Sequence, residues 1–442
     1  MLAMLGGMSA RAADSFPFTV ENVGDYQRRE GNTLTLYQYN GRHKPEIVFP
    51  ANFGGVDCWV EGRRCFPGAR IPIDLAKSRR GGAKWEVRFR ASGQARRYFV
   101  RPLPGDFPEY STSGESKLAK AIVMGGPVSG RGNSHLLIVG PKGDLLFYRQ
   151  EPVPVFDFRP HSAGGKNFFS YLELTGNNAQ VNSEGLRVVL DDGMNPIKRF
   201  GPCLDMHEFY YFGGDHFMAS YFELRQSPLG IAFIDQRIKE YDGEKLLFDF
   251  GFDDLRKSGV FLPAIGAKRV VFQGRLATNA FHLNAFTPFP DGRLLVSYGG
   301  DTVIFLRKDT KEIEWSFAGA NDQYDVAQAI APWFFHSPIF DPARRTLTLF
   351  DNGNPEIGSR VLEYTLDMAK KKVEKFDVIR AQGEFTDSMG SVMVDGDVYS
   401  IDFAELRKGK STFVEMADHK TTMEIAFKAR TFSPYRIYRA DF

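Results

Sequence analysis

Three histidines occupy matching places in three separate repeats of this 442-residue sequence. They are its clearest candidates for chemistry. His207, His282 and His336 each stand at the start of a run in which apolar and polar residues alternate. A neutral imidazole acts near pH 7 as a nucleophile, a general base or a metal ligand. Histidines at one phase of a repeat either share a site or each hold a turn through hydrogen bonds, and the spacing leaves both interpretations open.

A zinc site with three imidazole ligands and an open fourth position is a further interpretation of the same pattern. Apart from Glu208, no carboxylate stands near the histidines at a spacing that indicates a supporting ligand shell. No phosphate-binding loop, dinucleotide fingerprint or calcium loop occurs either. We therefore expect neither a bound metal nor a cofactor.

The repeats are pairs of short strands joined by polar turns, because apolar and polar residues alternate over a few positions between turn residues. One set of hairpins includes the three histidines and covers residues 207–224, 282–298, 336–352 and 390–403. The other set has a polar turn followed by a strand rich in aromatic residues, at residues 135–148, 186–200, 233–250, 303–317 and 361–378.

Two successive hairpins form a four-stranded antiparallel sheet of roughly 45–55 residues, which is the size of a propeller blade. We predict an all-β fold, a six-bladed β-propeller over residues 118–442 preceded by a small N-terminal β-sandwich. Seven blades, a β-helix or a second sandwich are the alternatives. The innermost strand of each blade lines the channel of a propeller, so the predicted fold brings the three imidazoles to one rim.

The N-terminal part has a different pattern. Residues 14–105 contain short alternating runs and no helical periodicity, which favours a small β-sandwich, and the proline-containing segment 101–116 is typical of a linker. Residues 1–13 are small and apolar and end in an A-x-A-like pattern, which indicates the remnant of a signal peptide. Cys58 and Cys65 either form a disulfide or remain free thiols, and the pair agrees with export.

The composition supports the all-β prediction and excludes several classes. The sequence has 40 Phe, 17 Tyr and 44 Gly, residues that favour strands and tight turns. Lys plus Arg exceed Asp plus Glu by only two, 56 against 54, so the charge indicates no nucleic-acid partner. No segment has 18 consecutive apolar residues, and we expect no membrane span.

The segments around the histidines resemble the bacterial arylsulfate sulfotransferase family. The run 281–319 is similar to a family segment in which a His-x-Asn motif, here His282 and Asn284, leads through an Asp-Gly turn to a Trp-containing strand. Segment 207–217 resembles the family's His-Asp-Phe segment, with Glu208 in place of Asp. Segment 334–367 is similar to the segment that carries a histidine, then Phe-Asp-Asn-Gly and Ser-Arg.

The resemblance implies a periplasmic or secreted enzyme that moves a sulfuryl group from an aryl sulfate donor to a phenolic acceptor without a nucleotide donor. It implies a ping-pong mechanism in which His336 is the nucleophile and becomes a sulfohistidine, while His207 and His282 bind sulfuryl oxygens or handle the phenol proton. Asn284, Tyr298 and Phe335 are the candidate substrate-binding residues.

One departure from the family bears on activity. The family has an arginine in the strand after the His-x-Asn motif, and the aligned residue here is a glycine, Gly299. A guanidinium supplies a fixed charge and up to five donors. Either another cation replaces it, or the substrate differs, or the activity is weak. A non-catalytic propeller that binds a ligand or a protein is the alternative function.

Overall fold

The computed structural model describes residues 18–21, 27–30, 32–37, 45–51, 57–73, 85–91, 94–103, 107–127, 133–174, 185–227, 230–260, 268–272, 274–279, 282–379, 385–404, 412–427, 432 and 434–442. The predicted signal-peptide remnant, residues 1–13, lies outside them. The chain forms two compact units. The first is Met1–Phe107 with Phe147–Gln150, and the second is Pro108–Leu146 with Glu151–Phe442.

The first unit contains two β-sheets around one apolar core. One has the order β1 (Thr19–Glu21), β4 (Glu46–Val48), β7 (Arg70–Pro72); the other has the order β2 (Gln27–Glu30), β3 (Thr33–Tyr37), β9 (Gln94–Leu103), β8 (Trp85–Ala91), β5 (Asp57–Val60), β6 (Arg63–Cys65). Phe18, Phe49 and Phe89 are buried in its core. Cys58 and Cys65 face each other across the β5–β6 hairpin and form a disulfide.

The second unit is built from antiparallel hairpins at the positions that the sequence pattern predicted. Its sheets follow the chain. They are β14 (Val155–Ala163), β15 (Lys166–Leu174), β16 (Gly185–Leu190), β17 (Pro196–Gly213), β18 (His216–Gln226), β19 (Ala232–Asp242) and β20 (Lys245–Phe250); then β23 (Leu283–Pro288), β24 (Arg293–Tyr298), β25 (Thr302–Arg307) and β26 (Ile313–Phe317); then β27 (Phe335–Asp341), β28 (Thr346–Asp351), β29 (Arg360–Asp367) and β30 (Lys372–Ile379).

The two ends of this unit complete its first and last sheets. The C-terminal strand β35 (Ile437–Ala440) pairs with β11 (Ala121–Pro127), which continues to β12 (Ser134–Val139) and β13 (Leu145–Glu151). The last sheet contains β31 (Ser391–Asp395), β32 (Val398–Phe403), β33 (Thr412–Ala417) and β34 (Lys420–Phe427), and β10 (Tyr110–Gly114) adds to its edge. Part of the predicted linker is therefore a strand, because its alternating polar residues fit the exposed edge of that sheet.

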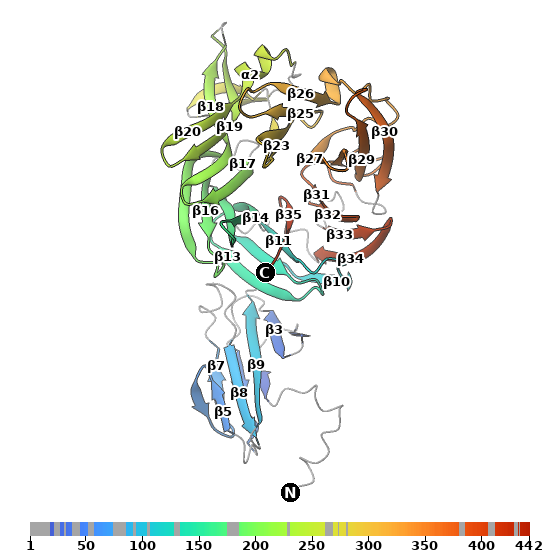
Figure 1. Cartoon of the computed structure of the whole chain (residues 1–442). Coiled ribbons are helices and arrows are strands. Elements are labelled where there is room, and N and C mark those ends of the chain that lie inside the picture. Colours follow the sequence, from blue (N-terminus) through green and yellow to red (C-terminus); the bar gives the residue numbers. More distant parts are fainter. Residues whose placement is uncertain are drawn as a thin grey trace. The chain divides into compact units, whose positions relative to one another are not determined.

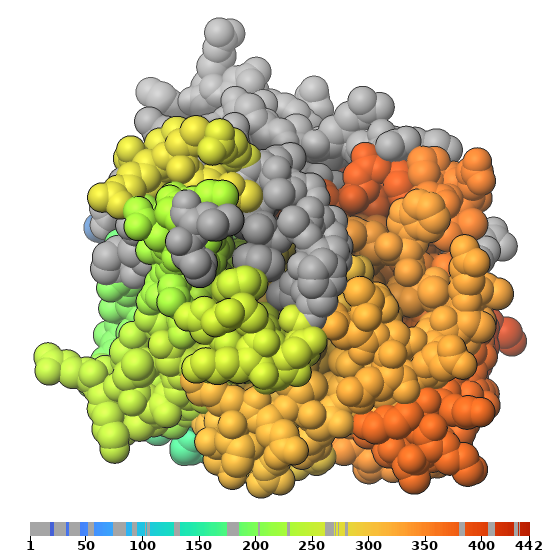
Figure 2. All heavy atoms as spheres, turned by 90° about the horizontal axis from the view of Figure 1, so that it is seen from above, coloured from blue at the N-terminus to red at the C-terminus, as the bar shows by residue number. Residues whose placement is uncertain are grey.

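The sheets stand around a common centre, which makes the second unit a β-propeller (Figure 1). The innermost strands contact one another in the order β35, β14, β17, β23, β27, β31, and β31 in turn contacts β35, so the ring closes. This confirms the all-β, propeller part of the prediction. In the space-filling view, green and orange segments occupy opposite sides of one face (Figure 2).

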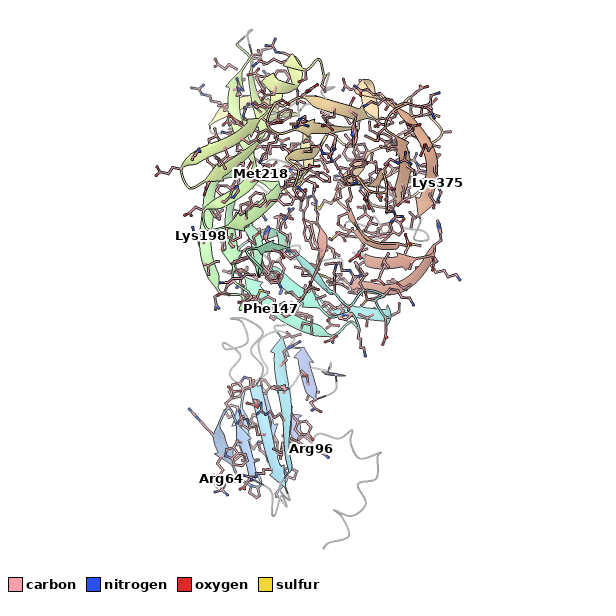
Figure 3. The ribbon with its side chains drawn as sticks, in the orientation of Figure 1. Arg64, Arg96, Phe147, Lys198, Met218 and Lys375 are labelled. Carbon is pink, nitrogen blue, oxygen red and sulfur yellow. A yellow bond between two sulfur atoms is a disulfide. The ribbon has the colours of Figure 1, made fainter. Side chains whose placement is uncertain are left out.

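Apolar clusters fill the space between neighbouring sheets, because a single sheet cannot bury both of its faces alone. Met218 and Phe250 pack against Phe286 of the next sheet, and Trp315 packs against residues of the β27–β30 sheet. Side chains such as Met218 lie between the sheets, whereas Lys198 and Lys375 lie at the outer edge of the ring (Figure 3). The short helix α2 (Phe252–Lys257) follows β20. The hairpin of β21 (Lys268–Phe272) and β22 (Arg275–Asn279) pairs through β22 with β19, which brings the sheet of β14–β20 to nine strands.

Candidate functional site

His336 lies at the start of inner strand β27, buried, in a fixed orientation. Its Nδ1 is 2.6 Å from Oδ1 of Asn352, and the Asn352 amide nitrogen donates to the carbonyls of Thr386 and Met389 at 3.0 and 3.1 Å. Because that amide group donates elsewhere, its oxygen faces His336 and must accept, so the Nδ1 of His336 carries the proton. The lone pair of the neutral ring is therefore on Nε2.

The surroundings of His336 keep it neutral. Burial, with smaller contributions from the charges of Arg436 and His207, lowers its pKa to about 3, against the opposing hydrogen bond from Asn352. The ring of Phe334 packs edge-on against it, with 5.2 Å between centroids. The next residue, Ser337, has a φ of +48° at a bulge in the β27–β28 pairing.

His207 is part of a hydrogen-bonded chain that begins with a carboxylate. Its Nδ1 is 2.7 Å from Oδ1 of Asp205, and the other oxygen of Asp205 accepts from the Gln236 side chain at 3.3 Å. The oxygen of Gln236 in turn accepts the backbone N–H of Leu283 at 2.6 Å. An ionised carboxylate only accepts, so Asp205 fixes the proton on Nδ1 and leaves Nε2 to exchange protons with a ligand.

His282 lies against His207, with 4.5 Å between ring centroids and an interplanar angle of 81°. Burial, followed by the charges of His207, His336 and Arg436, holds its pKa well below the usual range of histidine. Its Nδ1 has no hydrogen-bond partner in the part of the chain that the structure describes. The three predicted histidines are thus close enough to influence one another's charge, and they come from strands β17 and β27 and the residue before β23.

The candidate substrate-binding residues lie in different places. Asn284 is fully buried, and neither atom of its side-chain amide has a partner among the described residues. Tyr298 and Phe335 instead pack in apolar clusters between neighbouring sheets. Their strands are covered on both faces, so an alternating pattern did not distinguish a residue facing the next sheet from one facing the site. The aromatic ring beside His336 belongs to Phe334.

Gly299 lies in the tight turn after β24 with a φ of +64°, and its N–H donates to the carbonyl of His282 at 2.6 Å. This left-handed conformation favours glycine over residues that have a Cβ atom. The turn that holds His282 therefore gives a physical reason for glycine at the position where the resembled family has arginine.

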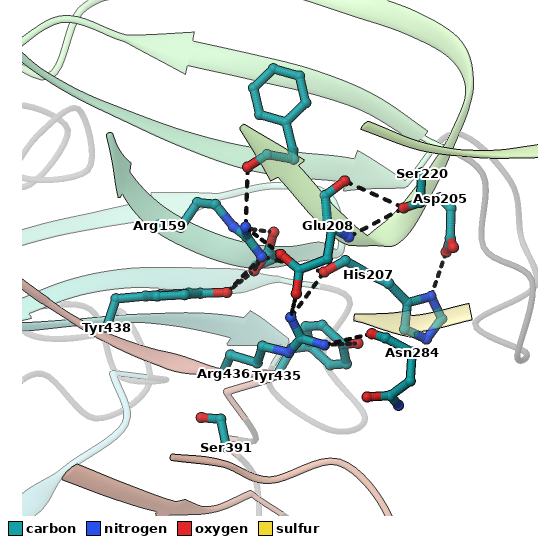
Figure 4. Close-up of polar contacts among 12 residues, drawn as sticks. Arg159, Asp205, His207, Glu208, Ser220, Asn284, Ser391, Tyr435, Arg436 and Tyr438 are labelled. Atoms are coloured by element: carbon teal, nitrogen blue, oxygen red, sulfur yellow. Dashed lines mark hydrogen bonds and ion pairs between the residues drawn. The ribbon is translucent and has the colours of Figure 1, made fainter. Parts of the chain in front are cut away.

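A cation that the sequence analysis missed stands beside the histidines. Arg436, buried just before β35, donates to the carbonyls of His207 and Asn284 at 3.2 and 2.8 Å and forms an ion pair with Glu208 (Figure 4). Arg159 contacts the other oxygen of Glu208 at 2.6 Å. Closure of the ring could have predicted this position from the sequence. A strand left over after the last hairpin pairs with the first sheet and lines the channel, and Arg436 directly precedes that strand.

Ion pairs join three arginines of this cluster to two carboxylates. Arg159 and Arg187 both contact Asp157, at 2.8 Å in each case. Although burial opposes ionisation, these two guanidiniums lower the pKa of Asp157. Three buried guanidiniums, counting Arg436, thus contact the two carboxylates of Asp157 and Glu208, while a third buried carboxylate, Asp205, contacts His207.

A cavity of about 510 Å³ runs along the inner strands and is lined by residues of all of them, among them Arg159, Ser391 and Arg436. Its lining includes Glu208 and Ser337, the residues that directly follow His207 and His336. Within the described ranges, no three side chains of His, Cys, Asp or Glu are grouped as metal ligands would be. The described residues also contain no helix of the length and hydrophobicity that a membrane span requires.

Comparisons with known proteins give no family for the chain. No family model and no curated protein matches it. Among solved structures it is similar to AztD from Citrobacter koseri (10% identity, 73% of this chain and 99% of that chain, TM-score 0.37). It is also similar to the Cps50 (Swd1) β-propeller domain of Myceliophteria thermophila (9% identity, 75% of this chain and 89% of that chain, TM-score 0.38). A third is a quinonprotein alcohol dehydrogenase-like protein from Bacteroides thetaiotaomicron (10%, 94% and 99%, 0.36). The fold assignment rests on the closed ring of sheets.

Proposed function

We propose that the chain is an aryl sulfotransferase that moves a sulfuryl group from an aryl sulfate to a phenol through a sulfohistidine at His336. The observation that carries the proposal is the state of His336. It is a buried, neutral imidazole whose tautomer is set by Asn352, so the lone pair of Nε2 is available to attack. A second imidazole with a carboxylate partner and the buried guanidinium of Arg436 stand nearby.

In the first half-reaction the Nε2 lone pair of His336 attacks the sulfur, and the bond between sulfur and the aryl oxygen breaks. For this step His207 starts as the imidazolium, protonated on both nitrogens, with Nδ1 facing Asp205; its Nε2 gives the proton to the leaving phenolate and the ring becomes neutral. In the second half-reaction His207 removes the proton of the acceptor phenol, the phenol oxygen attacks sulfur, and the N–S bond breaks. Both half-reactions balance without a cofactor.

His282 and Asn284 are the proposed binding groups for the sulfuryl oxygens. Both carry polar atoms that are buried and have no partner within the described residues, and an unpaired buried donor is costly unless a ligand uses it. Preorganised donors of this kind stabilise negative charge that develops in a transition state.

Three further proposals concern the chain as a whole. The nine-stranded sheet that contains β17 is interpreted as two blades that share this long strand, which gives six blades. The two sheets of the first unit are interpreted as a small β-sandwich. The Cys58–Cys65 disulfide supports a periplasmic or secreted location, because disulfides persist in oxidising compartments.

The test is a single-turnover experiment with 4-nitrophenyl sulfate. We expect a burst of nitrophenolate of about one equivalent per chain, and a peptide containing His336 that has gained the mass of SO₃. His336→Gln should abolish both signals, whereas His419→Gln, at an exposed histidine on another turn, should leave them unchanged. Folded wild-type protein that shows neither burst nor labelled peptide would reject the proposal and favour the binding-module alternative.

A further inference from the structure

We infer that Arg436, held by Glu208, is a positioning residue that fixes the strands carrying His207 and Asn284 and supplies positive charge beneath the sulfuryl group. The inference rests on the proposed function and deepens it. In this inference, the residue that precedes the C-terminal strand β35 has a role that neither the histidines nor the residues near Gly299 fill.

The first argument is the geometry of the guanidinium. Arg436 donates to the backbone carbonyl of His207 on β17 and to that of Asn284 on β23. These two strands belong to different sheets, so no ladder of backbone hydrogen bonds fixes one relative to the other. A planar guanidinium that donates to both carbonyls sets their separation.

The second argument is how firmly Arg436 itself is held. Glu208 binds Arg436 with one carboxylate oxygen and Arg159 of β14 with the other, and its own backbone N–H donates to the hydroxyl oxygen of Ser220 at 3.2 Å. The guanidinium also lies over the ring of Tyr435 at 4.9 Å, and that ring packs edge-on against His207 with 5.9 Å between centroids. Strands β14 and β17 and the start of β35 are therefore joined through one carboxylate, and Arg436 extends the connection to β23.

The third argument is electrostatic. Burial makes a charge costly unless it is paired, and the three guanidiniums of this cluster share only two carboxylates as direct partners. The charge of Arg436 contributes to lowering the pKa of both His282 and His336. The same positive charge favours an anion bound next to these rings. Its effect on the transferred group is larger than it would be in water, because the dielectric constant of a buried site is lower.

A purely structural role would give the same contacts, since Arg436 also anchors the strand that closes the ring. Arg439 is a matched control for that role. It is buried on the same strand and pairs with Glu415, Ser400 and the carbonyl of Lys120, away from the histidines. Arg436→Gln, Arg436→Lys and Arg439→Gln are the three variants to compare, each checked for folding through the fluorescence of buried Trp315.

Two measurements separate the inference from the proposed function. The first is calorimetric binding of benzenesulfonate, an anion that resembles the donor but cannot transfer its sulfur. We expect Arg436→Gln to weaken binding about tenfold or more, the scale of one charge-assisted contact, and Arg439→Gln to bind like the wild type. The second is the burst rate with 4-nitrophenyl sulfate, which should fall about a hundredfold in Arg436→Gln, the scale of one lost stabilising donor.

Arg436→Lys keeps the charge but loses the two-carbonyl contact. It should bind benzenesulfonate nearly as well as the wild type and still show a burst at least about tenfold slower. This variant covers the case in which Arg436→Gln does not fold. If the wild type binds benzenesulfonate more tightly than Arg436→Gln does but shows no burst, the anion-binding role of Arg436 stands and the sulfotransferase proposal is rejected. A wild-type chain that does not bind it, or folded Arg436 variants that match the wild type in both measurements, overturns the inference.

Discussion

The protonation state of His336 predicts how stability changes with pH. An unfolded histidine has a pKa of about 6.5, whereas the folded environment of His336 lowers its pKa to about 3. Between these values the unfolded chain binds a proton that the folded chain does not. The folded state therefore loses stability as pH falls below about 6.5, and the loss from this group is complete near the folded pKa. Above pH 6.5 the effect is absent.

The magnitude follows from the difference between the two pKa values. A pH of about 5 is about 1.5 units below the pKa of an unfolded histidine, and each unit corresponds to about 1.4 kcal/mol. Protonation of His336 in the unfolded chain therefore lowers the free energy of unfolding by about 2 kcal/mol. The perturbation is His336→Gln, which removes the titration. We expect the wild type to lose about 2 kcal/mol more than the variant between about pH 7.5 and pH 5.

The assay is urea unfolding of both proteins at the two pH values, followed through the indole of Trp315, which is buried in the second unit. The two-protein difference cancels the contribution of other titrating groups that do not interact with His336. An equal loss of stability in the wild type and the variant would show that folded His336 is protonated near pH 5. The pKa of folded His336 would then be close to that of an unfolded histidine, and the reasoning that its buried environment holds the ring neutral would be refuted.

Three further predictions concern neighbouring features. Asn352→Ala removes the acceptor that fixes the His336 tautomer, and should slow formation of the labelled peptide about tenfold, the scale of one hydrogen bond; an unchanged rate would contradict this. Gly299→Arg should destabilise the protein by about 1–2 kcal/mol because of its left-handed backbone, and it should not increase the burst rate. A faster burst would contradict this, since it would show that an arginine at this position improves catalysis. Asp402 is buried without a hydrogen-bond partner among the described residues, and burial raises its pKa. Above about pH 4 the carboxyl ionises more readily in the unfolded chain than in the folded one, so the wild type loses stability as pH rises. Asp402→Asn should therefore be more stable than the wild type above about pH 4, by a margin that grows with pH. Equal melting curves across that range would contradict it.

The hairpins and the propeller were predictable because their signals are local. Alternation along a strand and the polar residues of a turn depend on neighbours within a few positions, and they place His207, His282 and His336 at one phase of successive inner strands. The linker prediction was wrong in part, because Tyr110–Gly114 pairs with β34, and a strand added at a sheet edge has no partner nearby in the sequence.

The sequence by itself indicated which imidazoles could meet, because the repeat fixes the phase of each strand within its sheet. Tertiary structure alone decided what state they are in. Asn352 sets the tautomer of His336 from the next strand, and Arg436 reaches Glu208 across a separation of 228 residues. Contacts of this kind exist only after the ring has closed, and the burial that lowers the pKa of His282 and His336 comes from sheets that lie on either side in space.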